Sequence, residues 1–167
     1  MIRILMIILV FTLIEFDHAA ILPKNFTSSS SCPDGSFQGT NRQDCFLYND
    51  FPLTWYWALI NCSNTGGELA SIHDAFTNDL IKQHLSNFTN QQTWIGGELT
   101  SHCSFDGFCS YSWGWVDNSP FNYYNFAGEY PDPTIYENIV FNNNDGLWYV
   151  SHGLHPFLCK VPPKIFF

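Results

Sequence analysis

Hydrophobic and polar residues along the chain follow a helical period in two segments. The first helix is expected to begin near Thr54, just after Pro52, and to end at the glycine pair Gly66-Gly67. Its apolar positions recur at the spacing of one helix face, at Trp55, Ala58, Leu59 and Cys62. A second helix is predicted from about Asp74, whose carboxylate suits a helix N-terminus, to Leu85. Its predicted apolar face consists of Phe76, Leu80 and Ile81.

Short apolar runs bounded by turn residues predict strands. Residues 69–72 are predicted to be a buried strand or connector, and residues 93–97 a buried strand that ends in a glycine turn. Asn, Asp and Gly turns, including 142–146, separate three further strands, which are predicted to form an antiparallel meander: 137–141, 147–150 and 157–160. Two helices followed by clustered short strands indicate an α+β fold.

The stretch from Trp113 to Cys159 contains a long irregular loop, rich in aromatic residues and Asn, that strand-like segments enclose and that ends at the strand 137–141. Pro120, Pro131 and Pro133 remove backbone donors and restrict the residues before them, and Gly128 favours a turn. A loop of this length is usually either a binding loop or disordered. Its Trp and Tyr content favours binding, because disordered segments are poor in aromatic residues.

Length and composition are those of a single globular domain with a hydrophobic core, since 46% of the 167 residues are apolar. The net charge is -9 and the pI is near 4.8. Nucleic acids and anionic membranes bind clustered Lys and Arg, so the acidic balance argues against both as partners.

The N-terminal segment is typical of a secretory signal peptide, which we expect to span residues 1–19. Arg3 precedes the apolar run 4–14, and small residues follow at Ala19-Ala20. A retained signal anchor is the alternative, although the run is shorter than the ~20 apolar residues that span a bilayer. Residues 20–31, with a run of serines, are expected to form a flexible lead-in.

Three sequons of the type Asn-x-Ser/Thr begin at Asn25, Asn61 and Asn87. We expect N-glycans at Asn25 and Asn87. Asn61 falls on the first predicted helix beside a cysteine and is the least suited to modification.

Six cysteines, an even number, suit disulfides in an oxidising compartment: Cys32, Cys45, Cys62, Cys103, Cys109 and Cys159. No Cys-x-x-Cys pair is present, which favours disulfides over zinc. Spacing alone allows 15 pairings. Turn residues between Cys32 and Cys45 favour a small hairpin closed by its own disulfide, and residues 104–108 are expected to form a small surface loop.

Six short motifs occur in one order along the chain: Trp55-x-x-Ala58 leading to Cys62, Gly67-x-Leu69-Ala-Ser-Ile72, Trp94-Ile95-Gly96, Trp115-x-Asp117-x-Ser119-Pro120, Gly146-Leu147-Trp148, and Phe157-x-Cys159. With them the chain resembles the C-type lectin-like domain, which we place at residues 32–161, with 162–167 as a C-terminal tail. The Cys32 and Cys45 pair resembles the N-terminal hairpin of the long form of that family.

The resemblance also implies a disulfide pattern. It pairs Cys62 with Cys159 and leaves Cys103 and Cys109 to each other as an added local bridge. A further family disulfide is missing, because Ile139 stands where one cysteine is expected and residues 152–154 contain no partner.

In the family, calcium and sugar share one site in the long loop, where calcium takes 6–8 oxygen ligands. The resemblance aligns the first ligand triplet with Tyr130-Pro131-Asp132, a later Glu with Glu137, and an Asn-Asp pair with Tyr149-Val150. Asp132 and Glu137 remain as weak metal candidates, and Glu129 can add one carboxylate. We therefore expect no calcium at the usual site and no other cofactor.

The ligand is expected to bind to an aromatic surface of the long loop, because Tyr and Trp supply contact area at low entropic cost. The candidate residues are Tyr123, Tyr124, Glu129, Tyr130, Asp132, Glu137 and Tyr149. The alternative is that the aromatic rings fill the volume of an empty calcium site.

The sequence therefore predicts a secreted, extracellular binding protein and no enzyme, since no Gly-x-Ser-x-Gly elbow is present. Zinc at His152 and His155 lacks a third ligand. The resemblance implies carbohydrate as the partner, with another extracellular protein as the alternative.

Overall fold

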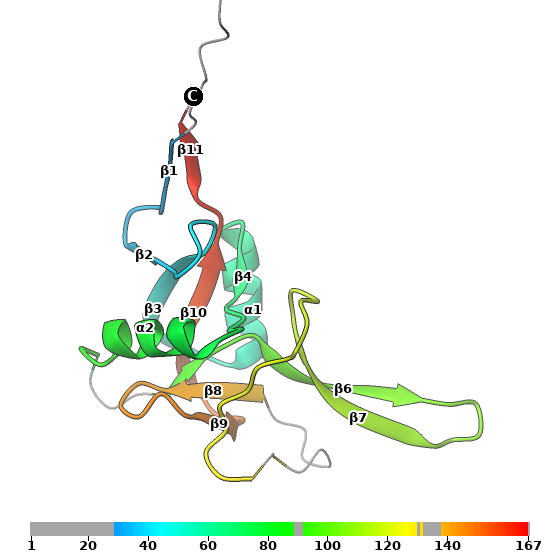
Figure 1. The fold of residues 1–167 in the computed structure, drawn as a ribbon. Coiled ribbons are helices and arrows are strands. Elements are labelled where there is room, and N and C mark those ends of the chain that lie inside the picture. Colours follow the sequence, from blue (N-terminus) through cyan, green and yellow to red (C-terminus); the bar gives the residue numbers. More distant parts are fainter. Residues whose placement is uncertain (1–28, 89–91, 130, 132–137, 167) are drawn as a thin grey trace, which may run out of the picture.

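The computed structural model describes residues 29–88, 92–129, 131 and 138–166. Within these residues the chain forms two helices, one seven-stranded sheet and a pair of two-stranded sheets (Figure 1). This arrangement is the α+β fold that the sequence predicts. The helices are α1 (Trp55–Asn64) and α2 (Ala75–Leu85), and the strands are β1 (Ser29–Ser31), β2 (Ser36–Gln38), β3 (Cys45–Leu53), β4 (Glu68–Leu69), β5 (Gln92–Trp94), β6 (Gly97–Cys103), β7 (Cys109–Trp115), β8 (Asn138–Asn142), β9 (Trp148–Ser151), β10 (His155–Val161) and β11 (Lys164–Phe166).

Helix α1 begins where the sequence predicts. The Thr54 side chain is the N-cap and accepts a hydrogen bond from the backbone N–H of Trp57. Trp55, Ala58 and Cys62 are buried, as the helical spacing predicts. The helix ends before Gly66, which adopts a positive φ of 77° that favours glycine.

Helix α2 has the predicted start but a different buried face. Asp74 caps it by accepting a 2.8 Å hydrogen bond from the backbone N–H of Thr77. The predicted core position Phe76 is wrong, because this side chain is 81% exposed. Ile81 is fully buried as predicted, and the other buried positions of the helix are Thr77, Asn78 and Leu85. Thr77 and Asn78 are polar but form their hydrogen bonds inside the fold. A prediction based on apolar residues alone therefore misplaces the buried face of α2.

Strand β10 lies inside the seven-stranded sheet, whose order is β2-β3-β10-β5-β8-β9, with β4 also paired to β10. It runs antiparallel to β3 and parallel to β5. The predicted meander is therefore wrong, since β10 does not pair with β9. Phe157, Leu158 and Cys159 are all fully buried, so this strand is covered on both faces, as an interior position requires. The β8-β9 hairpin and its turn at 142–146 match the prediction.

Strands β6 and β7 form a hairpin that projects from the body of the domain (Figure 1). Its tip at 104–108 is the expected surface loop, closed by the Cys103–Cys109 disulfide. The sequence does not predict the flanking strands. Their outer halves are exposed and largely polar, so the alternation that identifies a half-buried strand is absent.

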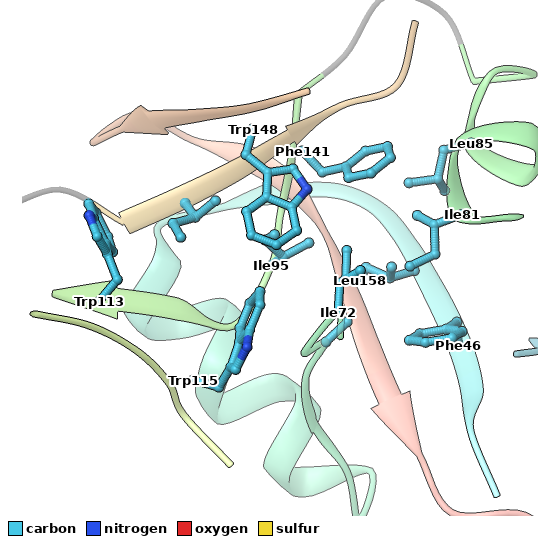
Figure 2. Packing of buried hydrophobic residues seen from close by; sticks show 12 residues of the cluster. Phe46, Ile72, Ile81, Leu85, Ile95, Trp113, Trp115, Phe141, Trp148 and Leu158 are labelled. Carbon is cyan, nitrogen blue, oxygen red and sulfur yellow. The ribbon is translucent and has the colours of Figure 1, made fainter. Parts of the chain in front are cut away.

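The core has two parts, one on each face of the seven-stranded sheet. Ile81 and Leu85 bring α2 against the first part, which is centred on Trp148. Figure 2 shows Trp148 beside Phe141 and above Trp115, whose ring centroid lies 5.4 Å from that of Trp148. The second part holds α1 against Trp94, Val140 and Phe157.

The three disulfides among the described residues are those that the resemblance implies: Cys32–Cys45, Cys62–Cys159 and Cys103–Cys109. Cys62–Cys159 joins α1 to the interior strand β10 across 97 residues of sequence. Ile139, at the missing cysteine position, is fully buried opposite Val150. The described part of the N-terminal lead-in, β1, pairs with β11 of the C-terminal tail.

Candidate functional site

The long loop starts from a fixed carboxylate. Asp117 follows β7, accepts a 2.5 Å hydrogen bond from the buried Ser71 hydroxyl, and accepts both the hydroxyl and the backbone N–H of Ser119. Burial opposes the ionisation of Asp117, but the hydrogen bonds from Ser119 and Ser71 outweigh it, so the pKa of the carboxyl is lowered. The charged form of Asp117 therefore holds the first turn of the loop against the segment after β4.

The middle of the loop is tied to β9 by backbone hydrogen bonds. The Trp148 N–H donates to Asn125 O at 2.8 Å, and the Ala127 N–H donates to Trp148 O at 2.9 Å. The Asn125 side chain donates to Gly146 O at 2.9 Å. Phe126 forms a parallel bridge with Trp148 between these bonds. The loop therefore behaves in this part as an additional strand beside β9.

Three loop rings pack around the indole of Trp148. The centroids of Phe121, Tyr123 and Phe126 lie 6.3, 5.6 and 5.8 Å from it, all with edge contacts. Tyr123, one of the predicted ligand residues, is therefore half-buried against the core. For Tyr123, this packing supports the alternative interpretation, in which the aromatic rings fill the volume of an empty calcium site.

Other predicted residues lie on the outer side of the loop. Tyr124 is 60% exposed, and Glu129 is also exposed. Because the neighbouring Tyr123 and Asn125 hold the backbone, Tyr124 is presented from a fixed segment. An exposed aromatic ring on a fixed backbone loses little entropy on binding, which suits a contact residue.

The two positions after Trp148 carry no calcium ligands. Val150 packs against the core part around Trp148, and Tyr149 packs against the part on the other face. The Tyr149 hydroxyl donates to Asp145 Oδ2 at 3.1 Å, and burial followed by this hydrogen bond raises the pKa of the phenol. A neutral phenol and an isopropyl group do not supply the charged oxygens that calcium requires.

Four of the other predicted positions lie outside the described residues: Tyr130, Asp132, Glu137 and Asn25. Asn87 is exposed just after α2. Among the described residues, no group of three or more His, Cys, Asp or Glu side chains is arranged to hold a metal ion. His155 contacts Ser151 at 2.7 Å and the edge of Trp94.

Two polar residues of this region were missed by sequence reasoning. Asp145 belongs to the segment 142–146, interpreted only as a hairpin turn, yet its carboxylate accepts the Tyr149 hydroxyl. Asn78 lies on α2 and forms hydrogen bonds with Gly146 O and the Trp148 indole, through which it supports the loop. An Asn in phase with Ile81 on a helix face is the signal that could have identified the second residue.

In the part of the chain that the structure describes, neither helix is long and apolar enough to cross a membrane.

Comparison with known proteins identifies one matching family and several similar proteins. The family model of the lectin C-type domain matches residues 51–160. The galactose-specific lectin nattectin of Thalassophryne nattereri is 31% identical over 137 residues, which cover 80% of this chain and 77% of that protein. A type-2 ice-structuring protein of Brachyopsis segaliensis is 29% identical over 143 residues, with coverage of 78% and 77%. The crystal structure of a calcium-independent type II antifreeze protein matches with a TM-score of 0.61 and 26% identity, covering 81% of this chain and 98% of that one.

Proposed function

The chain belongs to the lectin C-type domain family, and from this premise we propose that it binds carbohydrate through the long-loop face without calcium. The family and its relatives are lectin-like binding proteins. The relative that is 31% identical is named a galactose-specific lectin, which supports a glycan as ligand.

The observation that carries the proposal is the packing of Tyr149 and Val150. The resemblance places two calcium ligands at these positions, and both side chains here are committed to packing, with the Tyr149 hydroxyl on Asp145. The contact surface is instead formed by the exposed Tyr124 and Glu129. Aromatic rings stack on the apolar faces of sugars, and carboxylates accept hydrogen bonds from their hydroxyl groups.

Glycan-array binding in calcium and in EDTA tests the proposal. We expect the same glycans to bind in both buffers, and Tyr124→Ala to weaken binding by more than about 1 kcal/mol, as at an interface hot spot. Tyr56→Ala is the matched control, because Tyr56 is 61% exposed on α1 and Tyr124 is 60% exposed on the loop. Binding that disappears in EDTA, or that both variants weaken equally, would contradict the proposal.

Ice binding is a second candidate, because two of the similar proteins are named ice-structuring or antifreeze proteins and one of them is described as calcium-independent. Thermal hysteresis measured on the same sample tests it. Hysteresis in the absence of any glycan binding would favour ice as the ligand. Absence of both activities would favour another extracellular protein as the ligand.

We propose that the protein acts outside the cell. The signal-like segment 1–19 and the sequons at Asn25 and Asn87 support secretion with N-glycans. Expression in a eukaryotic host should release the protein into the medium with a mass excess that glycosidase removes. Retention in the membrane with residues 1–19 intact would contradict this.

A further inference from the structure

A pocket lies away from the long loop, between the β2-β3 hairpin and the C-terminal end of α2. Its volume is about 590 Å³, which falls within the range of ligand pockets, roughly 300–1,000 Å³. Phe37 of β2 and both Tyr48 and Asp50 of β3 line one side. His84 of α2 and Phe88, just after the helix, line the other.

The local structure explains why these side chains converge. Phe37 pairs across the sheet with Phe46, and Tyr48 and Asp50 follow Phe46 at alternate positions of β3, so the three project from the same face. Helix α2 lies on that face, where the His84 ring stacks on Phe37 with centroids 3.9 Å apart. Phe88 packs on Tyr48 with centroids 4.3 Å apart.

The charges around the pocket favour a cation. Asp50 is its one acidic lining residue, no Lys or Arg is among the lining residues that the structure describes, and the whole chain carries a net charge of -9. The Asp50 carboxylate has no ion-pair partner among the described residues. Burial, followed by the charge of Asp50, raises the pKa of the Tyr48 phenol, so Tyr48 presents a neutral ring.

The polar groups are too few for a saccharide. The Ser36 hydroxyl, which also lines the pocket, is already engaged with Pro33 O at 2.6 Å. The Tyr48 hydroxyl is likewise engaged with Thr93, which leaves Asp50 and His84 to meet a ligand. A sugar presents several hydroxyl groups that would each lose a hydrogen bond to water. Aromatic rings beside one carboxylate match the recognition of ammonium groups that carry carbon substituents.

We propose that this pocket binds a small organic cation of the alkylammonium class. The carbon substituents contact the rings of Phe37, Tyr48 and Phe88, and the positive charge lies near the Asp50 carboxylate. The site is independent of the long-loop face, because none of its lining residues belongs to that loop.

Calorimetric titration of the enzymatically deglycosylated protein with choline chloride tests the proposal, at ionic strength held constant with sodium chloride. We expect saturable binding, and much weaker binding of the neutral isostere in which carbon replaces the charged nitrogen. Asp50→Asn should weaken choline binding about tenfold, equivalent to about 1.4 kcal/mol. Phe88→Ala should also weaken it, whereas Phe51→Ala should not, although the two rings are exposed to a similar extent, 43% and 45%.

Several results would overturn the proposal. They are no saturable choline binding, equal binding of the neutral isostere, or choline binding that survives both Asp50→Asn and Phe88→Ala in variants with unchanged melting temperature. Galactose that displaces choline would identify a sugar site instead and would also overturn it. Tyr124→Ala should leave choline binding unchanged, so failure here is distinct from failure of the long-loop proposal.

Discussion

The indole Nε1 of Trp148 donates a 2.8 Å hydrogen bond to Asn78 Oδ1, and both side chains are buried. Asn78 Nδ2 in turn donates to Gly146 O at 3.0 Å. One helix residue therefore fixes both the central tryptophan and the turn before β9. Since the long loop is tied to the backbone of Trp148, Asn78 supports the binding face without reaching it.

Asn78→Ala should lower the free energy of unfolding by about 1–3 kcal/mol, because it leaves the buried Trp148 N–H without a partner. Urea denaturation measures the change. Asp79→Ala, at the exposed neighbouring position of α2, should shift stability by no more than about 0.5 kcal/mol. Equal midpoints for Asn78→Ala and the wild type would contradict this role.

Tyr123→Ala should reduce stability, whereas Tyr124→Ala should reduce ligand binding. Tyr123 packs on Trp148, so its truncation should destabilise the fold by roughly 1–3 kcal/mol. Tyr124 is 60% exposed, and its truncation should leave the melting temperature nearly unchanged while weakening ligand binding. Thermal melts and binding by each folded variant provide the comparison. A large loss of stability in Tyr124→Ala with normal binding would assign this ring to packing.

The loss of stability on removing a disulfide should increase with the length of the loop that the disulfide closes. In the chain-entropy model, Cys62–Cys159, with a sequence separation of 97, contributes about 4.7 kcal/mol, and Cys103–Cys109, with a separation of 6, about 2.4 kcal/mol. Replacing each pair by alanine and comparing denaturation midpoints tests the order. A greater loss from the Cys103–Cys109 pair would show that the projecting hairpin stabilises the domain in another way.

Asp117 should make stability sensitive to acid. Its pKa is lowered in the folded state below the ordinary value of 3.8, so its contribution is complete above pH 3.8 and is lost as the pH falls through the folded pKa. Asp117→Asn should remove this part of the acid dependence. Unfolding free energies measured from pH 5 to pH 2 on both proteins test it, and identical slopes would contradict the assignment.

The sequence predicts the helices and their caps well because these depend on local residues. Thr54 and Asp74 start their helices as expected, and Trp55, Ala58 and Cys62 face the core. Phe76 was misplaced because the phase of α2 is set by tertiary hydrogen bonds of Asn78. The place of β10 between β3 and β5 depends on long-range pairing, which local turn signals do not encode.

The candidate site was predicted in part for the same reason. Family motifs locate the loop and the positions Tyr149 and Val150. Tyr123 and Tyr124 are adjacent and identical in chemistry, yet one packs on Trp148 and the other is exposed. The backbone hydrogen bonds that connect Asn125 and Ala127 to Trp148 hold this segment in place, and no local sequence signal marks which ring turns inward.

We propose that the long-loop face binds its ligand without the calcium ion of the family site, and calorimetric titration with calcium tests this most directly. The packing of Tyr149 and Val150 predicts no site with a dissociation constant below about 10⁻⁴ M. One calcium ion bound more tightly than this, with an affinity reduced by Glu129→Gln, would contradict the account.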